Sequence, residues 1–341
     1  MRDGDRVLNR NPTSGFRKAA LLNPLAVILL AVLLVAGCGA LPSLAPVTIS
    51  HPVWMADGWV YYLREVSSDG FELWRQRGSQ GAAKRVLGRQ AITSICDGAQ
   101  LSFLFRATEQ EVGIAAACAG ATRMELTAYS PDRTTFRQLA STSFLSGVTL
   151  APGTAMGYVE LPTDCGIAIS PIRDGVVGDF AGPVRVAGSS WKLSGASPPD
   201  CGSVGWVRSP ALGPDGSLYF LTAPDSIGKL PVTNPNALDE FHWYLSSWDG
   251  KTPAARVVAT LPGVADLTVS PDGRSVIAAV STPDVGGIWM IDTATGKKEK
   301  IVKAGQAYHP SLSPDSSRYV FVEELDHLRF GSLPTRPGSG S

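Results

Sequence analysis

The chain alternates apolar and polar positions in short runs that are separated by tight turns. The clearest case is residues 267–280, LTVSPDGRSVIAAV, in which two apolar runs flank the tetrapeptide Ser270-Pro271-Asp272-Gly273. Proline pre-sets φ at the second turn position, aspartate bonds its own backbone, and glycine accepts positive φ. Because residues that alternate with a period of two form two-faced strands, the stretch predicts a β-hairpin.

The same order of strand, turn and strand recurs along the chain. The turns are centred on Asp57, Asp97, Gly153, Asp215, Asp272 and Asp315. A second series of hairpins follows them, at 72–87, 125–139, 244–261 and 288–302. A repeating unit of about 40 residues that contains two hairpins is typical of a four-stranded propeller blade. Beyond the first 40 or so residues no long stretch has a helical period, so the pattern predicts an all-β protein with almost no helix.

The sequence around these turns resembles the PD40, or TolB-like, β-propeller repeat, whose pattern is L/V-S-P-D-G-R/S-x-V/I. The resemblance covers roughly residues 45–333 and implies a six-bladed propeller of four-stranded antiparallel blades at 46–333. A blade cannot bury both faces alone, so blades stack around an axis. A seventh, degenerate blade in 107–128 or 174–203 is the alternative. We expect PVTI at 46–49 to complete the last blade, and the tail 334–341 to be disordered.

The first 37 residues have the pattern of a lipoprotein signal peptide. Five basic residues in 1–18 precede an uninterrupted apolar run of 13 residues, Leu25 to Gly37, and Val35-Ala36-Gly37-Cys38 resembles a bacterial lipobox. A spanning helix needs about 20 apolar residues, so the run suits a signal peptide better. The resemblance implies that Cys38 is lipidated, for example with palmitate, that 38–45 form a tether, and that the chain sits on the extracytoplasmic face of a cell membrane.

Charge and cysteine content fit that compartment. The whole chain has 30 basic and 30 acidic residues, and removing 1–37 leaves 25 and 28, a formal charge of −3. This balance argues against a nucleic-acid partner. Four cysteines remain after Cys38, and an even number outside the reducing cytosol favours disulfides over zinc. Pairing of nearest neighbours gives Cys96–Cys118 and Cys165–Cys201, although four cysteines allow three connectivities.

The turns also locate the mouth of the central channel, which the first strand of each blade lines. The residues six positions before each turn centre are His51, Ala91, Gly147, Ser209, Asp266 and His309. Blades five, six and one are neighbours in a closed ring, so Asp266, His309 and His51 are predicted to face one another at one rim. Two histidines and a carboxylate can contact a ligand, hold a divalent metal or exchange protons. Solvated polar residues at strand starts are the simpler alternative.

These observations support two classes of function. The first is a non-catalytic scaffold that presents its channel mouth, with His51, Asp266, His309 and Ser209, to an envelope protein, peptide or other ligand. The second is an extracytoplasmic hydrolase- or lactonase-like propeller enzyme with a metal or acid–base site at that mouth. The chain has no GxSxG, HExxH, P-loop or GxGxxG motif, so we expect no cofactor and favour the scaffold.

Overall fold

The structure is a computed structural model of the chain. It describes residues 48–67, 70–120, 123–143, 145–163, 166–180, 184–186, 192–193, 207–223, 242–282 and 284–334. The chain divides at Ala45, and every described residue belongs to the second unit, Pro46–Ser341. The predicted signal peptide, Cys38, Cys165 and Cys201 therefore lie outside the described residues.

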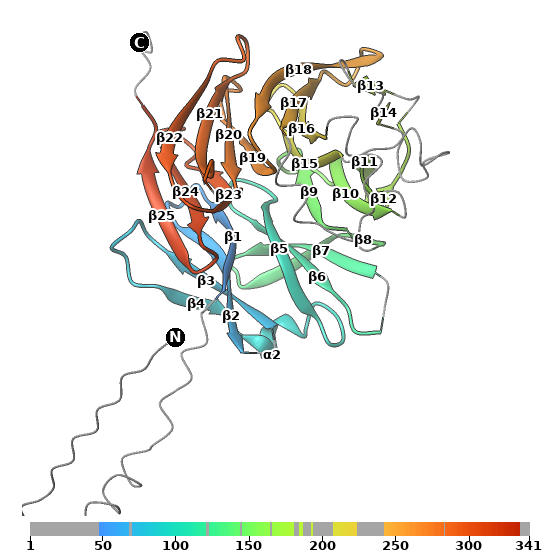
Figure 1. Ribbon diagram of the computed structural model, residues 1–341. Coiled ribbons are helices and arrows are strands. Elements are labelled where there is room, and N and C mark those ends of the chain that lie inside the picture. The colour runs from blue at the N-terminus through green and yellow to red at the C-terminus, as the bar shows by residue number, and fades with distance from the viewer. Residues whose placement is uncertain are drawn as a thin grey trace, which may run out of the picture. The chain divides into compact units, whose positions relative to one another are not determined.

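Antiparallel sheets arranged in a ring make the second unit a six-bladed β-propeller (Figure 1). Blade one contains β1 (Ile49–Trp54), β2 (Val60–Ser67), β3 (Gly70–Gln76) and β4 (Lys84–Leu87). Blade two contains β5 (Gln100–Arg106), β6 (Val112–Ala117), β7 (Arg123–Ser130) and β8 (Thr135–Ser143). Blade three contains β9 (Gly147–Leu150), β10 (Gly157–Thr163), β11 (Gly166–Arg173) and β12 (Val176–Val177).

The remaining three blades differ in strand number. Blade four contains β15 (Val207–Leu212), β16 (Leu218–Thr222), β17 (Trp243–Trp248) and β18 (Ala254–Leu261), and its outer edge is extended by β13 (Val184–Val186) and β14 (Lys192–Leu193). Blade five contains β19 (Ala265–Val269), β20 (Ser275–Val280), β21 (Gly287–Asp292) and β22 (Lys298–Lys303). Blade six contains β23 (Ala307–Leu312), β24 (Arg318–Glu323) and β25 (His327–Ser332).

The first strand of each blade lines the centre of the ring. These strands, β1, β5, β9, β15, β19 and β23, contact one another in that order, and β23 closes the circle on β1. The second strand of each blade lies between the first and third strands of its own sheet, and the neighbouring blades cover both of its faces. This position explains why β16 and β20 are buried at every residue and read as continuous apolar runs. The outermost strand of blade five, β22, is mostly polar, and half of its residues are exposed.

The hydrophobic core is divided into six clusters, each shared by two neighbouring blades. One cluster joins Leu221 and Trp243 of blade four to Val276 of blade five, and another joins Trp54 and Val60 of blade one to Val320 of blade six. The other four clusters join blades one and two, two and three, three and four, and five and six. Each blade therefore depends on its neighbours for burial, as stacking of half-buried sheets requires.

Hydrogen bonds within the SPDG turn explain why the motif recurs between first and second strands. The Ser270 hydroxyl donates to Asp272 Oδ1 at 2.5 Å, and the same oxygen accepts the Arg274 N–H at 3.0 Å. The Ser275 N–H donates to Ser270 Oγ at 2.9 Å, and Gly273 has φ +70°. Blade six repeats the arrangement, since the Ser313 hydroxyl donates to Asp315 at 2.6 Å. The tetrapeptide is thus a self-contained hairpin turn.

The prediction of six blades is confirmed, but two details are wrong. Residues 107–128 lie within blade two and β12 to β14 lie on the outer edges of blades three and four, so the described residues contain no seventh blade. Ile49 and Ser50 pair with Arg64 and Leu63 of β2, so this end of the segment 46–49 belongs to blade one and does not complete blade six. Residues 46 and 47 lie outside the described residues.

The register of blade two is also corrected. Asp97-Gly98 precedes the innermost strand β5, and the turn that follows β5 is formed by residues 107–111. The residues before Asp97 form the short helix α2 (Arg89–Ile92) and a series of turns, and Cys96 is tied to Cys118 by a disulfide. The long apolar run LSFLF therefore becomes the inner strand. Ala91 lies on α2, so it is not equivalent to His51. No described helix is long and apolar enough to cross a membrane.

Candidate functional site at the channel mouth

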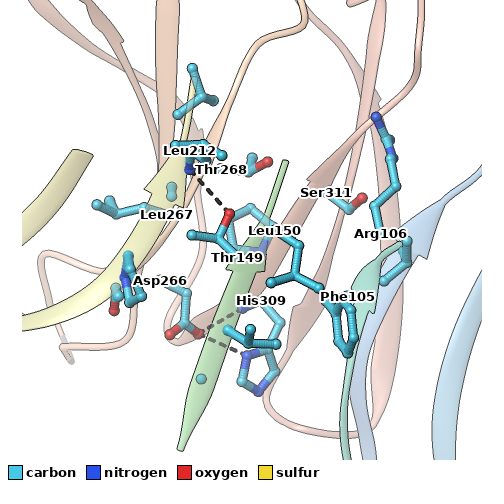
Figure 2. Close-up of a pocket in the computed structure, with 18 of the residues that line it drawn as sticks. Phe105, Arg106, Thr149, Leu150, Leu212, Asp266, Leu267, Thr268, His309 and Ser311 are labelled. Atoms are coloured by element: carbon cyan, nitrogen blue, oxygen red, sulfur yellow. Dashed lines mark hydrogen bonds and ion pairs between the residues drawn. The ribbon is translucent and has the colours of Figure 1, made fainter. Parts of the chain in front are cut away.

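The six inner strands enclose a central cavity of about 470 Å³. The strands run in the same direction along the channel, so one mouth is formed by their first residues and the other by the turns that follow them. His51, Ser209, Asp266 and His309 all line the cavity near the first mouth. Figure 2 shows Asp266 and His309 at one end of the channel and Ser311 and Arg106 farther along it.

Three of the inner strands begin with the same backbone irregularity. In β1, β15 and β23 a residue-proline pair, His51-Pro52, Ser209-Pro210 or His309-Pro310, lies opposite a single residue of the next strand. The first residue of each pair has positive φ, at 49°, 52° and 48°. Such a bulge re-aims a side chain, and proline suits it because proline has no N–H to leave unpaired. Left-handed backbone at these non-glycine residues costs about 1–3 kcal/mol each.

Carboxylates of the preceding blade satisfy the N–H groups that two of these bulges release from the sheet. The His309 N–H donates to Asp266 Oδ2 at 2.9 Å, and the Ser209 N–H donates to Glu160 Oε2 at 2.6 Å. Asp266 lies on β19 of blade five and Glu160 on β10 of blade three. Each bulge is therefore held by a carboxylate from its neighbour, which couples the strained backbone to the contact between blades.

Asp266, His309 and His51 form one side of the mouth. His309 Nδ1 lies 3.0 Å from Asp266 Oδ2, and the ring of His51 stacks on that of His309 with centroids 3.9 Å apart and planes at 25° (Figure 2 shows the Asp266–His309 bonds). Burial raises the pKa of Asp266, but His309, through its charge and its two hydrogen bonds, and Arg208 outweigh burial and hold that pKa well below its usual range. Burial, followed by the adjacent His309, lowers the pKa of His51 well below 6.5, against a smaller opposing effect of Asp266.

Glu160 and Arg208 form the other side, which the sequence did not predict. Glu160 is 4% exposed, and its Oε1 accepts a hydrogen bond from the Ser146 hydroxyl at 2.8 Å. Arg208 Nε lies 3.8 Å from the same oxygen, too far for a hydrogen bond. The Ser209 hydroxyl donates to the Ala265 carbonyl at 2.8 Å, which links blade four to blade five.

Together these groups form a row of polar side chains across the mouth, from blade three to blade one. We call Glu160, Arg208, Asp266, His309 and His51 the mouth row. Two of its nitrogens, Arg208 Nε and His51 Nδ1, are buried and have no hydrogen-bond partner. Buried polar atoms are satisfied in the great majority of native structures, so each unsatisfied atom calls for an explanation.

Near the far mouth, a single guanidinium links three blades. The guanidinium of Arg106, at the end of β5, donates from Nη2 to the carbonyls of Trp54 at 2.6 Å and Leu312 at 3.0 Å. One side chain of blade two thus joins blades one and six where the ring closes. Burial lowers the pKa of Arg106, with a smaller opposing effect of Glu109.

The other predicted site residues have separate locations. Gly147 begins β9 and lines the cavity, but it has no side chain to offer a ligand. Cys96 and Cys118 form a disulfide with a Cα–Cα distance of 5.7 Å, which is the pairing expected of nearest neighbours. Within the described part of the chain, no group of three or more His, Cys, Asp or Glu side chains is arranged to hold a metal ion.

Comparison with known proteins places the chain by fold only. No protein-family profile matches it, and no curated protein sequence matches it. Among solved structures, it resembles a gluconolactonase from Xanthomonas campestris with 15% identity and a TM-score of 0.51 over 84% of this chain and 86% of that one. A putative TolB from Agrobacterium tumefaciens has 15% identity and a TM-score of 0.47 over 73% and 79%. An oligogalacturonate lyase in complex with manganese has 10% identity and a TM-score of 0.48 over 84% and 91%. At these identities the likenesses show the fold alone, because one fold supports many functions.

Proposed function

We propose that this chain is a lipid-anchored binding protein of the cell envelope, and that its propeller captures a ligand or a segment of a partner protein at the mouth row. The observation that carries the proposal is a pair of buried nitrogens without a hydrogen-bond partner, Arg208 Nε and His51 Nδ1, on two residues that line one cavity from opposite sides of the ring. If the channel had only a structural role, we would expect apolar side chains to fill it, because buried polar atoms without partners are destabilising.

The geometry favours binding over catalysis. Asp266 Oδ2 already accepts two hydrogen bonds from His309, and both oxygens of Glu160 accept bonds from serine groups. The carboxylates are therefore fixed in place as structural acceptors. A rigid rim with a few polar groups that lack partners has the character of a pre-formed recognition site.

The anchor is supported by the N-terminal pattern and by the disulfide. Basic residues, a short apolar run and the lipobox-like Val35-Ala36-Gly37-Cys38 follow in the order of a lipoprotein signal. The bond between Cys96 and Cys118 suits a compartment outside the reducing cytosol. Metabolic labelling with palmitate should mark the wild-type protein and leave Cys38→Ala unmarked. Equal labelling of both proteins would refute lipidation at Cys38.

Binding at the mouth is tested by photo-crosslinking in intact cells. Tyr308 precedes His309, with ring centroids 6.2 Å apart, so a benzoylphenylalanine at position 308 reports on molecules at the mouth row. The same probe at the exposed Gln110, beyond the far end of β5, is the matched control. We expect one reproducible adduct from position 308 that is lost in Arg208→Gln. The proposal fails if no adduct forms, or if the adduct persists in the variant.

A catalytic role is the second candidate, because the His309–Asp266 pair at 3.0 Å has the geometry of a base and the group that orients it. Such a site would hydrolyse a simple sugar lactone faster than buffer alone, and His309→Asn would remove the excess rate. Equal rates for wild type, variant and buffer would refute catalysis on sugar lactones and favour the binding function.

A further inference from the structure

We infer that blade one carries a second site, separate from the mouth row, that binds the phosphate group of a phosphomonoester. The site consists of Trp59 and the three cations around it, Arg75, Arg77 and Lys84, and we call it the Trp59 cluster. The Trp59 cluster does not depend on the proposed function of the channel, because it lies beyond the opposite end of β1 from the mouth row. His51 is at the start of β1, whereas Trp59 follows the turn after its end.

Three positive groups converge on a single indole. The guanidinium carbons of Arg75 and Arg77 lie 4.5 and 5.0 Å from the centre of the Trp59 ring, and Lys84 Nζ lies 5.7 Å from it. Adjacent strands provide them, since Arg75 and Lys84 are directly paired between β3 and β4. The face of an indole attracts each cation. The three like charges repel one another, so the arrangement is stabilised when an anion joins it.

No carboxylate pairs with these cations among the described residues. Arg75 Nη1 donates to the Tyr61 hydroxyl at 3.3 Å, and Arg77 Nη2 donates to the Asp57 carbonyl at 2.9 Å. The Asp57 carboxylate is already occupied, since it accepts hydrogen bonds from the Trp59 N–H at 2.9 Å and from the Tyr61 hydroxyl at 3.1 Å.

Two nearby basic residues, unlike these three, are neutralised by a carboxylate. Arg85, beside Lys84 on β4, lies 3.3 Å from Glu72, and Arg137 of blade two lies 2.6 Å from Glu111. Cations also lie over Trp74 and Trp289, but among the described residues Trp59 is the one tryptophan that three cations approach. Arg77 and Lys84 are exposed, so a solute can reach them.

Charge and geometry indicate the class of anion. Three cations and the adjacent Asp57 leave a local charge of about +2, which matches the −1.5 to −2 of a phosphomonoester near neutral pH. Guanidinium groups present planar pairs of donors that suit phosphate oxygens. Three cations lie over the Trp59 ring, so the phosphate group is the part of the ligand that the site recognises. A phosphate on a small or lipidic alcohol presents that group in its simplest form.

The test uses the full-length protein and a soluble probe, glycerol 3-phosphate, by isothermal titration calorimetry. Loss of a charge-assisted hydrogen bond weakens binding by about tenfold or more. Arg77→Gln and Lys84→Gln should each weaken binding of the probe by at least that factor, whereas Arg85→Gln, the neutralised neighbour, should leave it unchanged. All three residues are exposed, and matching circular dichroism spectra establish that the variants fold.

A second arm separates a soluble phosphomonoester from a lipid headgroup. Vesicles of phosphatidylcholine, with or without phosphatidic acid, are floated with wild-type protein and with Arg77→Gln. Wild-type protein should bind the soluble probe. If the natural ligand is a headgroup, the protein should also bind vesicles that contain phosphatidic acid more strongly than neutral vesicles, and Arg77→Gln should lose that difference. Binding of the soluble probe alone assigns a free phosphomonoester. The inference is overturned if neither probe binds, or if Arg85→Gln weakens binding as much as Arg77→Gln.

Discussion

Replacing His51 with asparagine should change how the stability of the propeller depends on pH. The folded protein keeps the His51 ring neutral, because burial and the stacked His309 lower its pKa well below 6.5. Asparagine does not titrate, and it is one of the few non-glycine residues that tolerate the positive φ of 49° at this position. The variant therefore removes the titration while keeping the bulge.

The sign and size of the effect follow from linkage. A group whose pKa is depressed by folding contributes its stability in full above its unfolded pKa, here 6.5, and loses it as the pH falls toward the folded pKa. Between these values the unfolded chain binds one proton more than the folded chain. Over the range from pH 7.5 to 5.5, wild-type protein should lose about 1.4 kcal/mol more free energy of unfolding than His51→Asn.

Equilibrium unfolding in urea at half-unit steps of pH measures this difference. His242→Asn is the matched control, because His242 is exposed and its replacement should leave the pH profile parallel to that of wild type. If His51→Asn also runs parallel to wild type between pH 7.5 and 5.5, His51 is not held neutral by the fold, and the description of the mouth row is wrong.

Three further substitutions test the framework around the channel. Arg106→Met leaves two backbone carbonyls without their donor and should lower the free energy of unfolding by about 2–3 kcal/mol in urea. Gly273→Ala places a side chain at φ +70° and should cost about 1 kcal/mol or more, whereas Gly178→Ala, which has no positive φ and open space around it, should cost less. Replacing Cys96 and Cys118 together by serine opens a bond that spans 22 residues, and a loss of about 3 kcal/mol is expected by calorimetry under non-reducing conditions.

Each of these predictions has a clear contrary result. Unchanged stability in Arg106→Met would mean that ring closure does not depend on this guanidinium. Equal costs for the two glycine substitutions would remove the argument from turn geometry. Unchanged stability of the double serine variant would mean that the β5–β6 hairpin alone constrains this segment and that the disulfide adds no stability.

The spacing of turns predicted much of the fold because the SPDG motif is self-contained. Its hydrogen bonds join residues no more than five positions apart, so the turn forms wherever the tetrapeptide occurs. Counting from such turns placed His51, Asp266 and His309 at equivalent positions, and the structure brings these three side chains together. Local sequence was sufficient because the bulges also follow a local signal, a polar residue before proline.

The same rule failed in blade two because Asp97-Gly98 has the right residues in another setting. Its turn precedes β5 in a segment held by the Cys96–Cys118 disulfide. Nearest-neighbour pairing predicted that bond, but the residues around Asp97 gave no sign that their turn lies before the inner strand and not after it. Glu160 and Arg208 were missed for a related reason. Their roles come from contacts between blades, across 49 positions of sequence in the case of Ser209 and Glu160. A charged residue within the apolar run YVEL was the one available signal for Glu160.

The binding function at the mouth row is tested most directly by the affinity of the molecule that is captured from position 308. Its dissociation constant is compared between wild-type protein, Arg208→Gln and a control, Asp215→Asn, whose exposed carboxylate lies in the turn after β15. We predict binding at least about tenfold weaker for Arg208→Gln, because the ligand loses a charge-assisted hydrogen bond, and unchanged binding for the control. Equal affinity of all three proteins would contradict the assignment of the channel mouth as the binding site.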